Sequence, residues 1–406
     1  MTHKGVHQAE AHEAQILRLV ARNELSAEQQ CRLRDLTAQT SDWGKVCRLA
    51  QYNGITPLLN RQIAAHCADL TPPQVVDELS RQCRTLARRN YMQTAELVRI
   101  SQVCALEGIQ IIVFKGPALA ATAYGDTALR PFGDIDVLVK EADCERLWQI
   151  LTESGYTTKP QTSVDLFRPL LVKLGHEQSF ERHNERNTVT SLIDLHWSLY
   201  VDYLGRSTSL TLLPPNPIVL CGDSSLRTLA PEELLVFLAV HGTKHRWEMM
   251  LWAVDVGELI ARTPNLDWEK VDSICAELRT ERMLALALNL AVEHLQLPCV
   301  VPTRWLEMFA RDKTLQSLAT RSTKKWYIDS PPPPEQLRAS WYYKTRAFDR
   351  HIDGWRFLLH ELFAPTVREW MAYPFPAAML PLYYVLRPVL LVRGFLGRLI
   401  KETVAR

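Results

Sequence analysis

Two aspartates, two residues apart, are the residues of this sequence best suited to chemistry. They stand in Asp134-Ile-Asp136-Val-Leu-Val139, whose apolar and β-branched residues predict a strand. Alternate side chains share one face of a strand, so both carboxylates point the same way and repel each other unless a cation lies between them. Carboxylate oxygens favour Mg²⁺ or Mn²⁺. The alternative is a solvated strand end with turn-type aspartates.

A third carboxylate occurs on another predicted strand. Asp194 lies in Ser191–Leu199, with His196 on the same face two residues later. Three carboxylates on neighbouring strands could bind two metal ions around a triphosphate, one activating an acceptor oxygen and the other holding the leaving phosphates. The alternatives are a salt bridge between Asp194 and an arginine, and an orienting or packing role for His196.

A glycine turn precedes the aspartate pair. Ile109–Phe114 is rich in β-branched residues and predicts a buried strand, which Lys115-Gly116-Pro117 breaks. Ala118–Tyr124 then predicts a helix, with Pro117 suited to its first turn.

This order of elements resembles the polymerase β-like nucleotidyltransferase superfamily: a strand, a glycine turn and helix, Asp-x-Asp on the next strand, and a later strand aspartate. The chain resembles more closely an uncharacterised bacterial nucleotidyltransferase family, over most of its length. The matching segments are Lys115-Gly116, Tyr124-Gly-Asp126, Arg130, Asp134–Val139, Ile193–Trp197, His241–Trp247, Leu362–Pro365 and Leu382–Pro388.

The resemblance implies roles for individual residues. Asp134 and Asp136 would ligate metal, Asp194 would complete the site and act as the base, and Gly116 would let the backbone approach the phosphates. The chain departs from the superfamily at the turn, where Gly-Ser or Gly-Gly-Ser is usual. Lys115 would then replace the serine hydroxyl as a point charge, the alternative being an ordinary surface lysine.

Two further basic residues are candidates for contacts with the nucleotide. Arg130 is one, unless it pairs with Asp126 or Asp134. Lys244 is the other, in a segment where the alternative is helix packing with hydrogen-bonded histidines at His241 and His245. We expect the neighbouring residues Trp247, Trp252 and Asp255 to belong to the core or to helix surfaces.

The implied activity is the metal-dependent transfer of a nucleoside monophosphate from a nucleoside triphosphate, such as ATP, to an acceptor hydroxyl, with release of pyrophosphate. The acceptor could be a small molecule, a protein or a tRNA end. The alternative is a non-catalytic nucleotide-binding or scaffold protein of a biosynthetic pathway, which could associate with a membrane.

The elements around these residues predict an α+β fold, with a small mixed β-sheet core embedded in a largely helical protein. We expect helices over residues 1–108, the nucleotidyltransferase core over 109–210, a helical domain over 211–329 and a C-terminal helical region over 335–406. Ser26 and Gln29 resemble a capping box, and Gly108 is suited to end a long helix. Glu177–His183 and Ser191–Leu199 predict a strand pair, while Ser330–Pro334 predicts a stiff spacer.

Composition narrows the class of protein. The 406 residues are 47% hydrophobic and 23% charged, which excludes a disordered, collagen-like or coiled-coil chain. A net charge of +2 argues against a nucleic-acid partner on overall charge alone. The nine cysteines form no Cys-x-x-Cys pair, which favours free thiols in a reducing compartment and hence a cytoplasmic protein.

The C-terminal apolar stretch, residues 377–392, is interrupted by Pro381, Arg387 and Pro388. It is therefore not expected to cross a membrane. Basic residues beside it suggest an interfacial helix on anionic lipid as one possibility, and packing onto the rest of the protein as the other.

Overall fold

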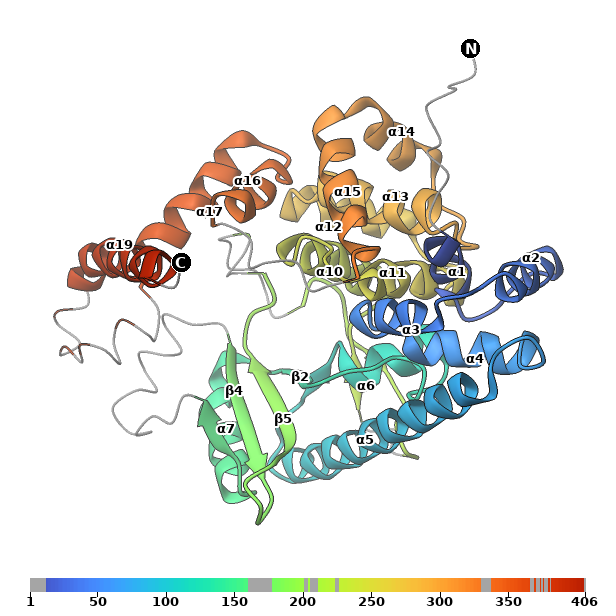
Figure 1. The fold of residues 1–406 in the computed structure, drawn as a ribbon. Coiled ribbons are helices and arrows are strands. Elements are labelled where there is room, and N and C mark those ends of the chain that lie inside the picture. Colours follow the sequence, from blue (N-terminus) through green and yellow to red (C-terminus); the bar gives the residue numbers. More distant parts are fainter. Residues whose placement is uncertain are drawn as a thin grey trace.

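The computed structural model describes residues 12–159, 177–200, 204, 211–222, 226–329, 337–365, 369, 373, 375, 379 and 381–404 (Figure 1). Its N-terminal part is helical. The helices are α1 (His12–Val20), α2 (Ala27–Ala38), α3 (Trp43–Tyr52), α4 (Thr56–His66) and the long α5 (Pro73–Leu106). The predicted capping box of Ser26 and Gln29 opens α2, and Gly108 follows the end of α5 with φ of +73°.

A mixed sheet follows and confirms the α+β prediction. Its strands are β1 (Ile112–Val113), β2 (Ile135–Leu138), β3 (Thr157–Lys159), β4 (Glu177–His183), β5 (Val189–His196), β6 (Asn216–Pro217) and β7 (Arg227–Thr228). Their order is β3-β4-β5-β2-β1-β7-β6. The predicted pair β4 and β5 forms an antiparallel hairpin, whereas β2 and β5 run parallel.

Short helical segments connect the first strands. They are α6 (Gly116–Leu119), a π-helical turn at Ala120–Tyr124, a 3₁₀ turn at Glu141–Asp143 and α7 (Cys144–Glu153). The strand predicted at Ile109–Phe114 is wrong in length, because only Ile112 and Val113 pair with neighbouring strands. The amide of Ile109 still donates to the carbonyl oxygen of Cys104, so this residue closes the end of α5.

Helices again make up the rest of the described chain. They are α10 (Pro231–Lys244), α11 (Met250–Arg262), α12 (Trp268–Leu278), α13 (Glu281–Asn289) with a π-helical turn at Leu290–His294, α14 (Thr303–Arg311), α15 (Lys313–Trp326), α16 (Leu337–Arg346), α17 (His351–Phe363) and α19 (Pro381–Val404). In Figure 1 the sheet and α5 form the lower part of the molecule, and α10 and α11 lie above them. The predicted spacer Ser330–Pro334 lies outside the described residues.

The C-terminal helix corrects one expectation. Pro381 and Pro388 do not interrupt it, because Pro381 is its first residue, where no backbone N–H is needed, and Pro388 is accommodated inside it. None of the helices in the described part of the chain combines the length and the apolar character that crossing a membrane would require.

The two faces of the central strands pack against different hydrophobic clusters. On one face Ile112, Phe114 and Leu138 join the core of the surrounding helices, and on the other Val113 and Val137 join a core formed with α5 and α7. Because side chains alternate along a strand, Asp136 shares the face of Leu138. Its carboxylate is therefore directed toward the layer of α10 and α11.

A buried ion pair ties this sheet region to α11. The guanidinium of Arg130 donates to both oxygens of Asp255, at 2.7 and 2.8 Å, and the hydroxyl of Tyr124 donates to Asp255 Oδ1 at 2.7 Å. Asp255 is fully buried and Arg130 is 6% exposed. Removing one member of such a pair leaves the other charge buried without its partner.

We therefore predict that Asp255→Ala lowers the free energy of unfolding by about 3–5 kcal/mol, measured by urea denaturation. Glu307→Ala is the control, because Glu307 pairs with Arg311 on the surface, where loss of the pair costs about 0–1 kcal/mol. Equal losses in the two variants would contradict the assignment of Asp255 as a buried anchor.

Candidate active site

A cavity of about 440 Å³ lies between the sheet and the pair α10 and α11. It has the size of a small-molecule site. We call it the sheet cavity. Its acidic lining residues are Asp134, Asp136, Glu177 and Asp194, and its lining also includes Lys115, Gly116, Arg130, His196, Phe237, His241, Lys244, His245 and Trp252. All the candidate residues predicted from the sequence thus line one cavity.

Strand register brings the predicted carboxylates together. Asp136 on β2 and Asp194 on the parallel strand β5 are direct partners, so their side chains share a face. Asp134 stands just before β2, two residues from Asp136. The alternative for Asp194, a salt bridge to an arginine, is absent from the described residues, and Ser179, its partner on β4, lies beside it instead.

Asp136 already has two cationic or polar partners. Lys115 Nζ lies 2.7 Å and His196 Nε2 3.1 Å from its Oδ1 atom. Burial alone would raise the pKa of Asp136, but Lys115 and His196 outweigh it and hold the pKa well below its usual range. His196 also contacts Glu177 through Nδ1 at 3.4 Å and packs edge-on against Phe114, so it both orients and packs.

The other two carboxylates lack such compensation. Burial raises the pKa of Asp134, and the neighbouring Asp136 raises it further. Burial also raises the pKa of Asp194, with Asp136 and Asp134 adding to the effect against a hydrogen bond from Ser179. The site therefore carries more negative charge than its own cations neutralise.

Two buried oxygens make the site suitable for a divalent cation. Asp136 Oδ2 and Asp194 Oδ1 are buried and accept no hydrogen bond in the described part of the chain. Within that part, no three acidic, histidine or cysteine side chains are grouped closely enough to form a complete metal cage. Mg²⁺ does not need a complete cage of protein ligands, because waters and substrate phosphates usually complete its coordination.

The glycine turn lies directly against the aspartate segment. Gly116 has φ of +50°, and a Cβ atom there would lie 2.9 Å from the carbonyl oxygen of Asp134, so this close approach requires a glycine. Lys115 is not an ordinary surface lysine, since its side chain is 16% exposed. Burial lowers the pKa of Lys115, but Asp136 and Asp134 more than compensate and raise it above its ordinary value.

The two other predicted basic residues differ in what they contact. Arg130 lines the sheet cavity, yet its guanidinium binds Asp255 rather than the predicted partners Asp126 and Asp134. Asp255 is thus a charged anchor in the core. Lys244 lines the same cavity from the last turn of α10, and its role in nucleotide binding stays a prediction.

Aromatic rings form the wall opposite the carboxylates. His241 stacks on Phe237, with 5.9 Å between the ring centroids, and its ring centroid lies 5.8 Å from that of Trp252. Trp252, which we expected in the core or on a helix surface, therefore lies at the cavity. Burial and the charge of Lys115 lower the pKa of His241 well below its usual range, so the ring stays neutral. These rings pack against one another and give this part of the cavity an aromatic lining.

Polar residues of α5 hold the loop before β2; Asn90 and Gln93 are buried, whereas Arg89 is exposed. Asn90 donates to the carbonyl oxygens of Thr127 and Arg130, while Arg89 and Gln93 donate to that of Gly133, next to Asp134. Sequence reasoning missed these residues. The available signal was a set of polar residues at helical spacing within an otherwise apolar stripe.

The turn after α10 places Lys244, His245 and Met249 at the cavity. Arg246 and Trp247 within it both have positive φ, of 58° and 50°. Such consecutive backbone strain persists only where surrounding contacts hold it. One of these contacts is the indole nitrogen of Trp326, which donates to the carbonyl oxygen of Trp247 at 2.7 Å.

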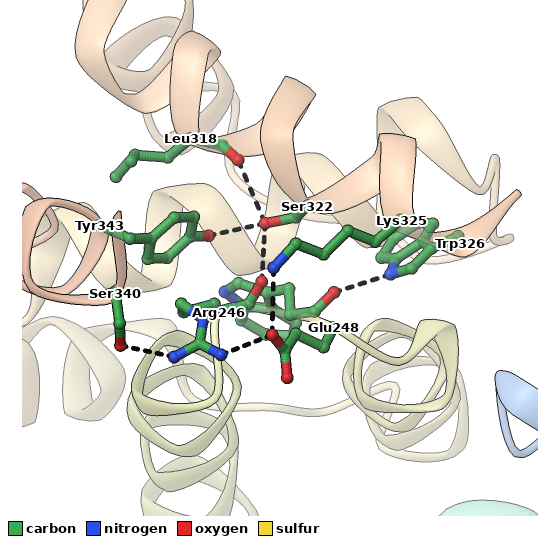
Figure 2. Close-up of polar contacts among 9 residues, drawn as sticks. Arg246, Glu248, Leu318, Ser322, Lys325, Trp326, Ser340 and Tyr343 are labelled. Atoms are coloured by element: carbon green, nitrogen blue, oxygen red, sulfur yellow. Dashed lines mark hydrogen bonds and ion pairs between the residues drawn. The ribbon is translucent and has the colours of Figure 1, made fainter. Parts of the chain in front are cut away.

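Figure 2 shows the remaining contacts of this turn with α15 and α16. Glu248 accepts from Arg246 at 2.5 Å and from Lys325 at 3.0 Å. Arg246 also donates to Ser340, and its carbonyl oxygen accepts from Ser322. Helices remote in sequence therefore fix one side of the cavity.

The raised pKa of Asp194 predicts that this residue destabilises the metal-free protein. Above an aspartate's ordinary pKa of ~3.9 the unfolded carboxyl ionises while the folded one resists. As the pH rises from about 3.9 to the raised pKa that Asp194 has in the folded protein, wild type therefore loses stability relative to Asp194→Asn. Without divalent cations, thermal unfolding should show Asp194→Asn the more stable at neutral pH and the two proteins alike near pH 3.

Asp77→Asn is the matched control, because Asp77 lies exposed on α5, and it should leave stability unchanged at both pH values. An Asp194→Asn protein less stable than wild type at neutral pH would show that the carboxylate is satisfied without a cation.

Comparison with known proteins agrees with this geometry. The model of the family described as uncharacterised nucleotidyltransferase matches residues 39–296, more than half of the chain. No curated protein and no solved structure matches the chain. The match spans the glycine turn, both aspartate strands and α10 with its following turn. The chain therefore belongs to the uncharacterised nucleotidyltransferase family.

Proposed function

We propose that the protein transfers a nucleoside monophosphate from a nucleoside triphosphate to an acceptor hydroxyl, in a reaction that depends on a divalent metal and releases pyrophosphate. Membership of the family supports nucleotidyl transfer in general. The observation that carries the finer proposal is the pairing of Asp136 with Asp194 on adjacent strands, each with a buried oxygen that accepts no hydrogen bond from the described residues.

The donor set fits Mg²⁺ or Mn²⁺, which Asp134, Asp136 and Asp194 would hold. The metal would supply positive charge against the phosphoryl oxygens as they gain negative charge. This arrangement is the one found in polymerase β-like nucleotidyltransferases, the subclass that we propose for the chain. ATP is the triphosphate that we propose as first substrate to test.

The chain's own residues would perform the remaining steps. Asp194, which lies beside Asp136 on the neighbouring strand and lines the cavity, would take the proton of the acceptor hydroxyl. Lys115 and Lys244 would place positive charge beside the triphosphate, and Gly116 would leave room for the backbone to approach it. Phe237 and Trp252 would stack against the base.

A second candidate function is nucleotide binding without catalysis, as in a scaffold protein of a biosynthetic pathway. The contact of Lys115 Nζ with Asp136 at 2.7 Å favours it, because this ammonium already neutralises one carboxylate without a metal. A protein of this kind would bind nucleotide and release no pyrophosphate.

Substitution of the carboxylates separates these functions. Asp136→Asn and Asp194→Asn should each lower pyrophosphate release from Mg·ATP, in cell extract that supplies acceptors, by at least about a hundredfold, since even residues that only support metal ligands cost 10- to 100-fold. Asp194→Asn is the more decisive variant because we expect it to fold stably. Asp77→Asn should match wild type, and full activity in either carboxylate variant would exclude the mechanism.

We further propose a cytoplasmic location, which fits the nine free cysteines. The acceptor could be a small molecule, a protein or a tRNA end. The C-terminal helices suggest contact with a membrane surface. Ile352, Trp355, Leu359 and Phe363 follow one face of α17. Four apolar residues follow one face of α19 in the same way, namely Leu382, Val385, Val389 and Val392. All eight are 45–69% exposed.

The charge of this region favours an anionic bilayer as the partner of these apolar faces. Residues 381–406 contain five basic residues and one acidic residue. Basic residues beside an exposed apolar helix face, with a tryptophan among the apolar residues, are typical of helices that lie in a lipid interface.

We predict that the protein sediments with vesicles that contain phosphatidylglycerol and much less with vesicles of phosphatidylcholine alone. The double variant Trp355→Ser/Val389→Ser should lower the bound fraction about tenfold or more, because each residue loses an apolar contact. Leu106→Ser/Val300→Ser, which changes two apolar residues exposed elsewhere, is the control. Failure of wild type to sediment with the anionic vesicles would refute this contact.

A further inference from the structure

A second cavity, of about 510 Å³, adjoins the sheet cavity. It lies between α5 and the segment containing α3 and the start of α4. Pro131, Phe132 and Gly133, together with Met249 and Leu251, line both cavities. The two cavities therefore adjoin each other at these five residues, and the second has the volume of a site for a small molecule.

The two cavities differ in charge. Four acidic residues line the sheet cavity, whereas the charged residues that line the second are Arg81 and Arg89, both on α5. We call it the arginine cavity. Arg81 pairs with Glu78 at 2.7 Å and is 65% exposed. Arg89 has no acidic partner among the described residues.

Arg89 also lies close to the reacting groups. Its Nη2 atom donates to the carbonyl oxygen of Gly133 at 3.2 Å, one residue before Asp134. A guanidinium presents several donors in a fixed plane, so one contact with a carbonyl leaves others for a phosphate or carboxylate. Thr85 and Gln82, one and two helical turns before Arg89, add uncharged polar groups to the lining.

From this arrangement we infer that the arginine cavity is the acceptor site, and that it takes a small molecule carrying a phosphate group in addition to its reactive hydroxyl. The inference rests on the proposed nucleotidyl transfer. In the proposed complex the triphosphate and its metal occupy the sheet cavity, so the phosphate group of the acceptor would lie in the arginine cavity, where Arg81 and Arg89 would attract it. The charge difference thus orients the molecule with its hydroxyl toward Asp194.

The transfer step forms one bond and breaks one bond at the α-phosphorus, and Asp194 takes up the proton that is released. The hydroxyl oxygen of the acceptor forms a bond to the α-phosphorus, and the bond from that phosphorus to the oxygen bridging to the β-phosphorus breaks. Pyrophosphate leaves with the bonding electrons. The hydroxyl proton passes to the Asp194 carboxylate and from there to water. The phosphate group of the acceptor does not react and serves for binding.

Inorganic phosphate is a probe for the arginine cavity that does not require the acceptor to be known. The full chain is first saturated with Mg²⁺ and α,β-methylene-ATP, which cannot release pyrophosphate and blocks the sheet cavity. Phosphate is then titrated and its binding followed by ³¹P NMR line width. Arg81→Ala and Arg89→Ala should weaken phosphate binding by about 10- to 100-fold, as expected for loss of a hydrogen bond to a charged group.

Arg84→Ala is the matched control. It removes the same charge from the same helix but does not line the cavity, so it should bind phosphate as wild type does. Arg89→Lys, which keeps the charge and loses the planar donors, should give an intermediate affinity and provides a second variant if Arg89→Ala does not fold.

The inference is overturned if wild type binds no phosphate at millimolar concentration, or if Arg81→Ala, Arg89→Ala and Arg84→Ala all weaken binding equally. Failure of the proposed function has a different signature, namely no binding of α,β-methylene-ATP in the first step. Phosphate binding can be measured in that case too, without the nucleotide.

Discussion

The site depends on one constraint, which is that the carboxylate of Asp136 is buried in a sheet covered on both faces. A charge in that position must be compensated. Lys115, at the glycine turn, and His196, on the neighbouring strand, supply part of the compensation to one carboxylate oxygen. The other oxygen stays without a donor from the described residues. Strand register then sets Asp194 beside Asp136, and the accumulated negative charge makes the cleft a place for cations and for the phosphates that accompany them.

The surrounding helices keep this arrangement in place and give the cleft its polarity. Helix α5 holds the loop before β2 through Asn90, and it also carries the arginines of the second cavity. Helices α15 and α16 support the strained turn at Arg246 and Trp247, which lies between α10 and α11. The family match ends before these last helices, yet they contact the wall of the cavity. The helical regions are thus part of the site's construction.

Local patterns allowed much of the fold and the acidic part of the site to be predicted from the sequence. The capping box at Ser26, the β4–β5 hairpin and the closeness of Asp134 to Asp136 at one cavity follow from spacing over a few residues. The partners of Arg130 could not be predicted, because Asp255 is 125 residues away and is brought near only by packing of α11. The contact of Lys115 with Asp136 could not be predicted for the same reason, because it depends on which strand lies beside the glycine turn.

The central claim is that the acidic cleft binds nucleotide together with a divalent cation. Isothermal titration of the full chain with α,β-methylene-ATP tests it most directly, in buffer with Mg²⁺ and in buffer with a chelator. The account predicts saturable binding with Mg²⁺ and at least about tenfold weaker binding without it, because the triphosphate would then meet uncompensated carboxylates. Equal affinity under both conditions, or no binding in either, would contradict it.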